Sequence, residues 1–285
     1  MNGKNEPPRH QVTKVLHLLG VVVSWWFVLA LPAQKLEFRR LVPGVIEERL
    51  RLATDRNSKR KAALEKLFED AGCGDGHLTD QKVKHAGLPN VVCALPGTGD
   101  SVILVGAHYD HVAAGKGVVD NWSGAALLPS LFESLRGNAR RHTFLFIGFT
   151  DEEKGLVGSR FYAGELTPER VAKTRAMVNL DTLGLSGTKV WASHGDPKLV
   201  DALFRVAETL HLPLQGVNVE KAGSSDSESF ALRGIPSLSI HSITQETLRI
   251  LHSPADDMKA MKLAEYYDTY RLVVAYLAFL DTSLE

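Results

Sequence analysis

Cysteine is scarce in this sequence, whose 285 residues contain only Cys73 and Cys93. Neither belongs to a Cys-x-x-Cys pair or to a Cys/His cluster, so a structural zinc site built on thiolates is excluded. The two cysteines can form one disulfide if the chain enters an oxidising compartment, and they can also be two buried free thiols. Any metal site must therefore use other ligands.

An excess of charge of either sign is also absent, because 33 basic residues stand against 33 acidic ones. This balance excludes the electrostatic footprint of a nucleic-acid-binding protein and gives no reason to expect a polyanionic partner. Hydrophobic residues make up 44% of the chain and charged residues 23%, which is typical of a globular protein rather than a disordered one.

One long apolar stretch, residues 15–33, follows a short basic tail, residues 1–14. About 20 apolar residues can span a bilayer, and the same layout is typical of a secretory signal; a buried core helix is a third alternative. Leu31 lies where a cleavage site prefers a small residue, which favours an uncleaved transmembrane anchor. We expect a membrane-anchored protein whose main domain is extracytoplasmic (periplasmic or extracellular), or a secreted one if the segment is cleaved.

The rest of the chain alternates between helix and strand patterns. Residues 36–71 are charged and helix-like, since Leu64, Leu67, Phe68 and Ala71 recur at the spacing of one helix face. Strands are then expected at 90–95, 101–107, 143–149, 176–180, 189–192 and 237–241, and helices at 124–136, 156–163, 197–210 and 263–280. This order predicts one α/β domain over residues 36–285, a three-layer α/β/α fold with a mixed, mainly parallel central sheet.

Polar residues follow four of these strands where each apolar run ends. In parallel sheets ligands bind outside the carboxyl ends of the strands, so these positions are the candidates for a site. The residues are His108 to His111, Asp151 to Glu153, Asp181 and His241, and the loop 117–121 adds Asp120. Each alone is more often a cap or a solvated loop residue, but imidazole and carboxylate groups without cysteine together suit a catalytic zinc centre.

The motifs occur in the order of one known family. His108-Tyr109-Asp110, Asp120-Asn121, the run from Asp151 to Ser159, Asn179-Leu180-Asp181 and His252 resemble the aminopeptidase Y family of two-zinc exopeptidases. The resemblance extends from about residue 90 to residue 256. It implies a zinc exopeptidase that hydrolyses N-terminal residues from peptides or small aminoacyl substrates.

The resemblance also assigns residues to the site. It implies two zinc ions per chain and five ligands: His108, Asp120, Glu153, Asp181 and His252. Asp120 would bridge the ions, with His108 and Asp181 on different ions, and Glu152 would be the general base. The second predicted catalytic residue is Asp110, which would accept the free N–H of the His108 ring. A cis peptide bond is implied between Asp120 and Asn121.

Three further positions keep alternatives open. Asp256 can accept the free N–H of His252 or cap a following helix. Asp226 can lie near the substrate amine or be a buried helix cap, and Ser227 stands where many family members have histidine. We expect His111, His194 and His241 to be structural or solvent-facing.

Three functions compete at this stage. Hydrolysis is favoured by the continuation Lys154 to Ser159 after Glu153, which is similar to peptidases. A glutaminyl cyclase-like acyltransferase shares the scaffold and would bind one metal ion, whereas a non-catalytic binding module would have lost its ligands. The interval from Glu153 to Asp181 is too short for the lid domain that some dimeric two-zinc exopeptidases insert there. Aminopeptidase is preferred over carboxypeptidase, because no extra domain or basic site for a terminal carboxylate is visible.

Overall fold

The computed structural model describes residues 36–74, 76–218 and 223–285. The basic tail and the predicted anchor or signal segment at 15–33 lie outside the described residues. Within the described part of the chain, no helix is both long and apolar enough to cross a bilayer. Residues Leu36–Glu285 form one compact unit.

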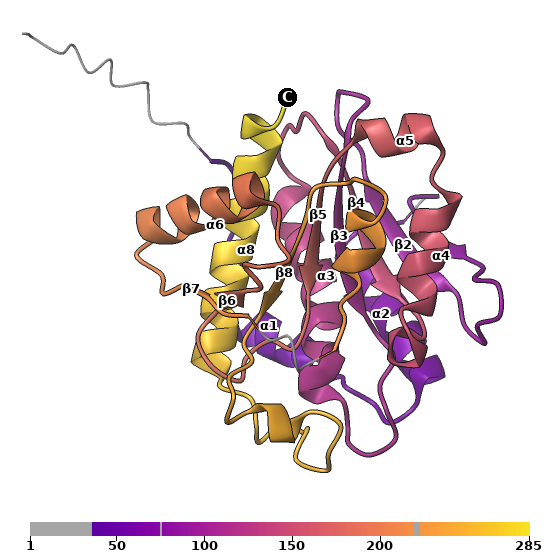
Figure 1. Cartoon of the computed structure of the whole chain (residues 1–285), viewed down its shortest axis with the longest axis vertical. Coiled ribbons are helices and arrows are strands. Elements are labelled where there is room, and N and C mark those ends of the chain that lie inside the picture. Colours follow the sequence, from indigo (N-terminus) through magenta and orange to yellow (C-terminus); the bar gives the residue numbers. More distant parts are fainter. Residues whose placement is uncertain (1–35, 75, 219–222) are drawn as a thin grey trace, which may run out of the picture. The chain divides into compact units, whose positions relative to one another are not determined.

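The centre of this unit is a mixed sheet of eight described strands in the order β1-β2-β4-β3-β5-β8-β6-β7 (Figure 1). The inner strands β4, β3, β5 and β8 run parallel, whereas β1, β2 and β6 pair in antiparallel fashion with their inner neighbours. The strands are β1 (Leu78–Gln81), β2 (Asn90–Leu95), β3 (Val102–His108), β4 (Thr143–Phe149), β5 (Thr174–Leu180), β6 (Lys189–Val190), β7 (Gln215–Gly216) and β8 (Ser237–His241). The predicted α/β class and mixed sheet are confirmed.

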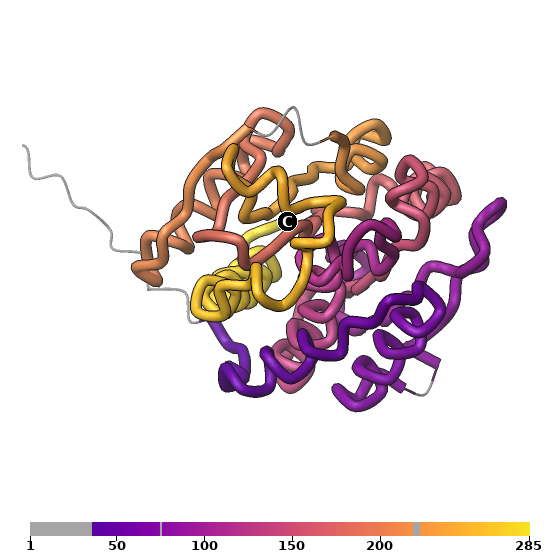
Figure 2. Tube along the Cα trace, turned by 90° about the horizontal axis from the view of Figure 1, so that it is seen from below, coloured from indigo at the N-terminus to yellow at the C-terminus, as the bar shows by residue number. Residues whose placement is uncertain are grey.

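Helices cover both faces of the sheet. They are α1 (Pro43–Leu50), α2 (Asn57–Asp70), α3 (Ser123–Leu135), α4 (Val157–Glu165), α5 (Pro168–Lys173), α6 (Pro197–Thr209), α7 (Ser227–Ala231) and α8 (Leu263–Ser283). Figure 2 shows α8 in yellow and α1 and α2 in indigo and violet on one side of the molecule, with α4 and α7 on the other.

Strand alternation decides which residues meet which helices. In β3, Ile103 and Val105 join the large cluster that contains the buried residues of α1, α2, α3, α6 and α8. Leu104, between them, joins a smaller cluster with Tyr162 of α4 and Phe230 of α7. Both faces of the sheet are therefore buried, which explains why its strands appear in the sequence as continuous apolar runs.

Several predicted elements agree with the structure and several were missed. Residues 90–95, 143–149 and 237–241 form strands with the predicted bounds, and the helix face of Leu64, Leu67, Phe68 and Ala71 is buried. Strand β6 ends at Val190, before the predicted residue 192. Strand β1 escaped prediction because Leu78-Thr79-Asp80-Gln81 is a polar edge strand without an apolar face; the short helices α5 and α7 were also missed.

The two cysteines form a disulfide, Cys73–Cys93, which joins the end of α2 to β2. The bond thereby links the N-terminal helices to the sheet. Of the two alternatives that the sequence left open, the structure has the bridged one.

Candidate metal centre

The polar residues predicted from the strand ends converge at one edge of the sheet. His108 is the last residue of β3, Asp181 follows β5, and Glu152 and Glu153 follow β4. These residues, with Asp120 and His252, line a cavity of about 260 Å³. The carboxyl ends of the three parallel strands therefore form one wall of the cavity.

Local backbone conformation directs these side chains. Asp151 and His252 have positive φ values of 52° and 54°, a left-handed conformation that is uncommon for residues other than glycine. Such conformations cluster at functional sites, where the surroundings enforce them. The peptide bond between Asp120 and Asn121 is cis, as the resemblance implied.

Asn121 fastens the loop that carries Asp120 to the end of β5. Its side-chain N–H donates to Leu180 O at 2.9 Å, and its Oδ1 accepts the backbone N–H groups of Gly124 at 2.9 Å and Thr182 at 3.2 Å. A Cβ atom on Gly124 would lie 2.4 Å from the same carbonyl of Leu180. Close packing here holds Asp120 beside the residues that follow the strand.

The carboxylate of Asp120 lies between two histidines. Its Oδ1 is 3.2 Å from His108 Nε2, and its Oδ2 is 3.3 Å from His252 Nε2. Each oxygen can therefore share an ion with a different imidazole. This is the geometry that a bridging carboxylate requires.

Of the two remaining candidate ligands, one lies near His108 and the other lies near His252. Asp181 Oδ1 lies 3.7 Å from His108 Nε2, and Glu153 Oε2 lies 2.9 Å from His252 Nε2. Two ligands of one tetrahedral zinc ion are about 3.4 Å apart, given bonds of about 2.1 Å. The distance between His108 and Asp181 is close to this value, so the geometry favours one shared position for them, whereas the resemblance implied different ions. Sequence order could not show which ligands share an ion.

Asp110 organises the site in a way that the sequence did not reveal. The Nδ1–H of His108 donates to the backbone oxygen of Asp110 at 3.2 Å, and the Asp110 carboxylate is 3.6 Å from the same nitrogen. The carboxylate instead accepts the backbone N–H groups of Glu152 at 3.0 Å and Glu153 at 3.3 Å. Asp110 therefore orients the His108 ring through its backbone and fixes the glutamate pair through its side chain.

The carboxylates of this cluster favour the binding of cations. Burial and nearby carboxylates raise the pKa of Glu152 to about 10 and that of Glu153 to about 7. A hydrogen bond to Asp120 raises the pKa of His252 to about 9, although burial opposes this shift. The protonated forms of Glu152, Glu153 and His252 are therefore favoured, whereas hydrogen bonds with His108 and His252 lower the pKa of Asp120 despite its burial. Bound divalent ions would replace those protons and supply the missing positive charge.

The donor set fits zinc. Two groups, His108 with Glu152 and Asp181, and His108 with Asp120 and Glu153, have ligand atoms within 4.8 Å of one another. Glu153 Oε1 is buried and has no hydrogen-bond partner among the described residues. Imidazole nitrogens and carboxylate oxygens in such numbers are the ligands of catalytic zinc sites.

Several aromatic and apolar residues that the sequence did not assign to the site also line the cavity. Trp191, His241, Ile243 and Leu251 provide its apolar and aromatic part. His241 accepts the N–H of Ile243 at Nδ1, and burial lowers its pKa to about 4, so the ring is neutral. His241 is structural, as predicted, but it also faces the cavity. Its place at the end of β8, directly after the apolar run, was the available signal.

Asp226 is completely buried and does not line the cavity. It occupies the N-cap position of α7 without making a cap hydrogen bond, and neither of its carboxylate oxygens has a hydrogen bond of normal geometry to a described residue. Burial raises its pKa to about 7, even though His108 and Ser159 oppose the shift. Asp226 therefore makes no cap hydrogen bond, although it lies at the start of α7.

The Asp226→Asn substitution is expected to raise the free energy of unfolding of the zinc-free protein, by a margin that grows between about pH 4 and pH 7. Over this window the folded wild-type chain keeps a proton on Asp226 that the unfolded chain loses, so its stability falls by up to about 1.4 kcal/mol per pH unit. Asparagine has no titratable carboxyl group, so the variant does not lose stability in this way. Urea unfolding of both proteins at pH 5 and pH 7 with a chelator measures the margin; equal margins at the two pH values contradict the raised pKa.

Comparison with known proteins supports a peptidase. The sequence profile of peptidase family M28 matches residues 90–277. Leupeptin-inactivating enzyme 1 of Streptomyces exfoliatus is 32% identical over 151 residues, 52% of this chain and 34% of that protein. A probable leucine aminopeptidase 2 of Aspergillus oryzae is 29% identical over 191 residues, 61% of this chain and 37% of that protein. The matched stretch thus spans about a third of the length of these relatives.

Solved structures share the fold. The Legionella pneumophila LapA aminopeptidase superposes with a TM-score of 0.71 at 21% identity, covering 86% of this chain and 73% of that one. An Acidobacteriales bacterium glutaminyl cyclase superposes with a TM-score of 0.69 at 19% identity, covering 88% of this chain and 98% of that one.

The family match covers more than half of the chain and includes every candidate ligand from His108 to His252. It also covers the β3, β4 and β5 strand ends from which the centre is built. The predicted family is therefore confirmed, and this chain belongs to peptidase family M28.

Proposed function

We propose that the protein is an aminopeptidase that uses two zinc ions to hydrolyse the N-terminal residue from peptides. The observation that carries this proposal is the Asp120 carboxylate, whose two oxygens each face a different histidine at 3.2 and 3.3 Å. In the proposed arrangement His108 and Asp181 hold one ion, Glu153 and His252 hold the other, and Asp120 bridges them. A non-catalytic module has no need to keep all five ligands.

Zinc bound at this position would polarise the scissile carbonyl and make the attacking water more acidic. Glu152 is the proposed general base, because it lies beside the ligand Glu153 and its Oε2 is 3.9 Å from His108 Nε2. It takes the proton from the attacking water and later returns it to the leaving amine. Asp110 holds the glutamate backbone in place during both transfers.

The cavity suits the N-terminus of a peptide better than its C-terminus. Carboxylates line its metal side, and they attract a cationic amine and repel a terminal carboxylate. Trp191, Ile243 and Leu251, which also line the cavity, offer an apolar surface for the side chain of the first residue. The names of the leucine aminopeptidase relatives agree with such a substrate.

The test is metal content combined with activity. The full-length purified chain is expected to contain two zinc ions and to hydrolyse an aminoacyl-anilide panel; a chelator should abolish the hydrolysis, and added zinc should restore it. Elemental analysis and absorbance assays measure both properties. A chain that binds no metal, or hydrolyses the panel equally well after complete chelation, would refute the proposal.

The same experiment addresses a cyclase. A glutaminyl cyclase-like enzyme would hold one ion and release ammonia from peptides with N-terminal glutamine, without cleaving a peptide bond. The position of Asp120 between two imidazoles supports two ions. One ion per chain together with ammonia release would favour the cyclase instead.

We also propose that residues 15–33 anchor the protein to a membrane, with the peptidase unit on the extracytoplasmic side. The apolar stretch supports attachment, and the Cys73–Cys93 disulfide is of the kind that persists in oxidising compartments. Fractionation of cells that express the full chain should find it in the membrane pellet. Soluble cytosolic protein with Met1 intact would rule out both an anchor and a signal.

A further inference from the structure

Arg60 is a fully buried arginine on α2, outside the part of the chain that the family profile matches. Its guanidinium group donates to backbone carbonyls: Nε to Thr54 O at 2.8 Å, Nη1 to Tyr109 O at 3.3 Å, and Nη2 to Gly117 O at 2.9 Å and to Lys116 O. Among the described residues no carboxylate forms an ion pair with it. The hydrogen-bond partners of this buried charge are all backbone oxygens. Arg60 therefore fixes the path of the backbone segments that carry these oxygens.

Three of these carbonyls belong to the loop between two candidate zinc ligands. Tyr109 directly follows His108, and Lys116 and Gly117 precede Asp120 by three or four residues. Gly117 has a φ of 53°, and a Cβ atom there would lie 2.9 Å from Arg60 Nη2 and 2.4 Å from His111 Cβ. The loop is therefore turned so that its carbonyls face the guanidinium group.

The same helix holds this loop at a second point. The Asn57 side chain, at the start of α2, accepts the backbone N–H of His111 at 3.3 Å. The Arg60 guanidinium group also lies 5.7 Å from the centre of the Trp122 ring, just beyond Asp120. Contacts from α2 thus reach both ends of the segment between His108 and Asp120.

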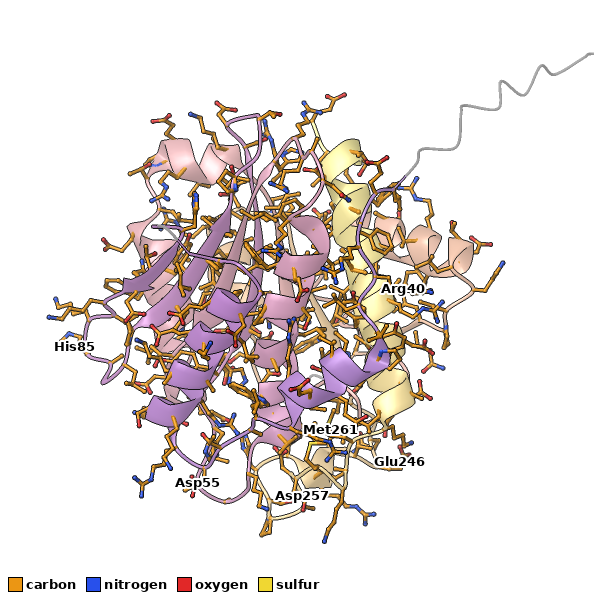
Figure 3. The ribbon with its side chains drawn as sticks, turned by 180° about the vertical axis from the view of Figure 1, so that it is seen from behind. Arg40, Asp55, His85, Glu246, Asp257 and Met261 are labelled. Atoms are coloured by element: carbon orange, nitrogen blue, oxygen red, sulfur yellow. A yellow bond between two sulfur atoms is a disulfide. The ribbon has the colours of Figure 1, made fainter. Side chains whose placement is uncertain are left out.

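Asp256 holds the other side of this segment. Its carboxylate accepts the backbone N–H of Val119 at 2.7 Å and of Asp120 at 3.2 Å, and its backbone oxygen accepts Lys116 N–H at 3.0 Å. Asp256 therefore neither pairs with His252 nor caps a helix, and both predicted roles were wrong. In Figure 3, Asp55, before α2, and Asp257, after Asp256, lie at the same end of the molecule.

The backbone from Lys116 to Asp120 thus lies between a buried cation and a buried anion. Carbonyls face Arg60 on one side, and N–H groups face Asp256 on the other. Burial lowers the pKa of Arg60 to about 10, while the nearby acids Asp256, Asp110 and Asp120 oppose the shift, so the group stays charged at neutral pH. The bridging carboxylate is attached to the end of this backbone.

We infer that Arg60 is a positioning residue of the metal centre, which sets the affinity for both zinc ions by fixing the loop that carries the bridging Asp120. This inference rests on the proposed two-zinc function. Arginine suits the task because its planar fork of five donors can reach several carbonyls at once, whereas lysine presents its donors at one point. Arg60 therefore acts through the geometry of its guanidinium group and not through its charge alone.

The test compares zinc affinity in the full-length wild-type chain and in the Arg60→Met and Arg60→Lys variants, by competition with a chromogenic chelator. Residues that orient metal ligands typically contribute about 10–100-fold to metal affinity, and we expect a loss of that size in both variants. Arg49→Met is the matched control. Arg49 is a largely buried arginine of α1 that pairs with Glu133 and contacts no ligand-bearing loop through its side chain.

Activity provides a second measurement. In both Arg60 variants kcat at limiting zinc should fall with zinc occupancy, whereas KM should change little because the apolar cavity wall comes from other elements. The Arg49→Met variant should lose thermal stability and keep the wild-type zinc affinity.

Three outcomes would overturn the inference: parental zinc affinity in Arg60→Met, recovery of that affinity by Arg60→Lys, or an equal loss in Arg49→Met. If neither Arg60 variant folds, Arg60 is a structural core residue and the inference also fails. Failure of the proposed function gives a different result, because the wild-type chain itself would then bind no zinc pair.

Discussion

Glu152→Gln is expected to lower kcat by about 10²–10⁴-fold, the usual contribution of a general base, while two zinc ions remain bound. Glutamine keeps the size of the side chain and its place beside Glu153, but it cannot accept a proton from water. Elemental analysis and hydrolysis of an aminoacyl-anilide measure the two properties on the same sample. Zinc retention is essential, since it separates loss of the base from loss of the centre.

Two matched variants complete this experiment. Glu153→Gln should lose zinc as well as activity, because Glu153 Oε2 lies 2.9 Å from His252 Nε2 at the second candidate position. Glu165→Gln changes an exposed glutamate at the end of α4 and should leave both properties unchanged. If Glu152→Gln retained near-wild-type turnover, the role of Glu152 would have to be reassigned.

Asp120→Asn is expected to reduce the zinc content from two ions to at most one and to lower kcat by at least about 10²-fold, as expected when a centre loses the ligand that joins its ions. Each carboxylate oxygen of Asp120 faces a different histidine. In asparagine an uncharged amide nitrogen replaces one of these oxygens, and an amide nitrogen does not bind zinc. Competition with a chromogenic chelator measures the number of ions and their affinities.

The control is Asp257→Asn. Asp257 directly follows Asp256 in the sequence. Its carboxylate accepts the backbone N–H of Lys259 at 2.8 Å, and the residue does not line the cavity. Wild-type zinc content is expected in this variant. If Asp120→Asn bound two ions with unchanged affinity, Asp120 would not be the bridge, and the two-zinc proposal would lose its main support.

Sequence patterns predicted the central fold because they are local. The strands at 90–95, 143–149 and 237–241 are short apolar runs with clear ends, and the structure gives them the same bounds. The carboxyl ends of the parallel strands β3, β4 and β5 meet at one edge of the sheet, so the convergence of His108, Glu153 and Asp181 could be predicted from the ends of the apolar runs. Polar edge strands such as β1 lack this signal.

The wrong predictions concern distance in space. Asp256 was considered as a partner of His252, four residues earlier in the sequence, or as a helix cap, but it binds the backbone of Val119 and Asp120. Asp226 was considered for substrate binding; the structure buries it completely, and it is not among the residues that line the cavity. The interpretation of Asp256 treated a neighbour in the sequence as a neighbour in space.

The sequence by itself determined the α/β class, the family and the set of ligand candidates, because strand periodicity and short motifs are properties of consecutive residues. Only the tertiary structure decided that His108 lies beside Asp181, that Trp191 and Leu251 line the cavity, and that Arg60 reaches the loop before Asp120. These relations join segments far apart in the chain. They depend on strand order, crossover paths and loop conformation, which are fixed by packing of the whole domain and not by any local pattern.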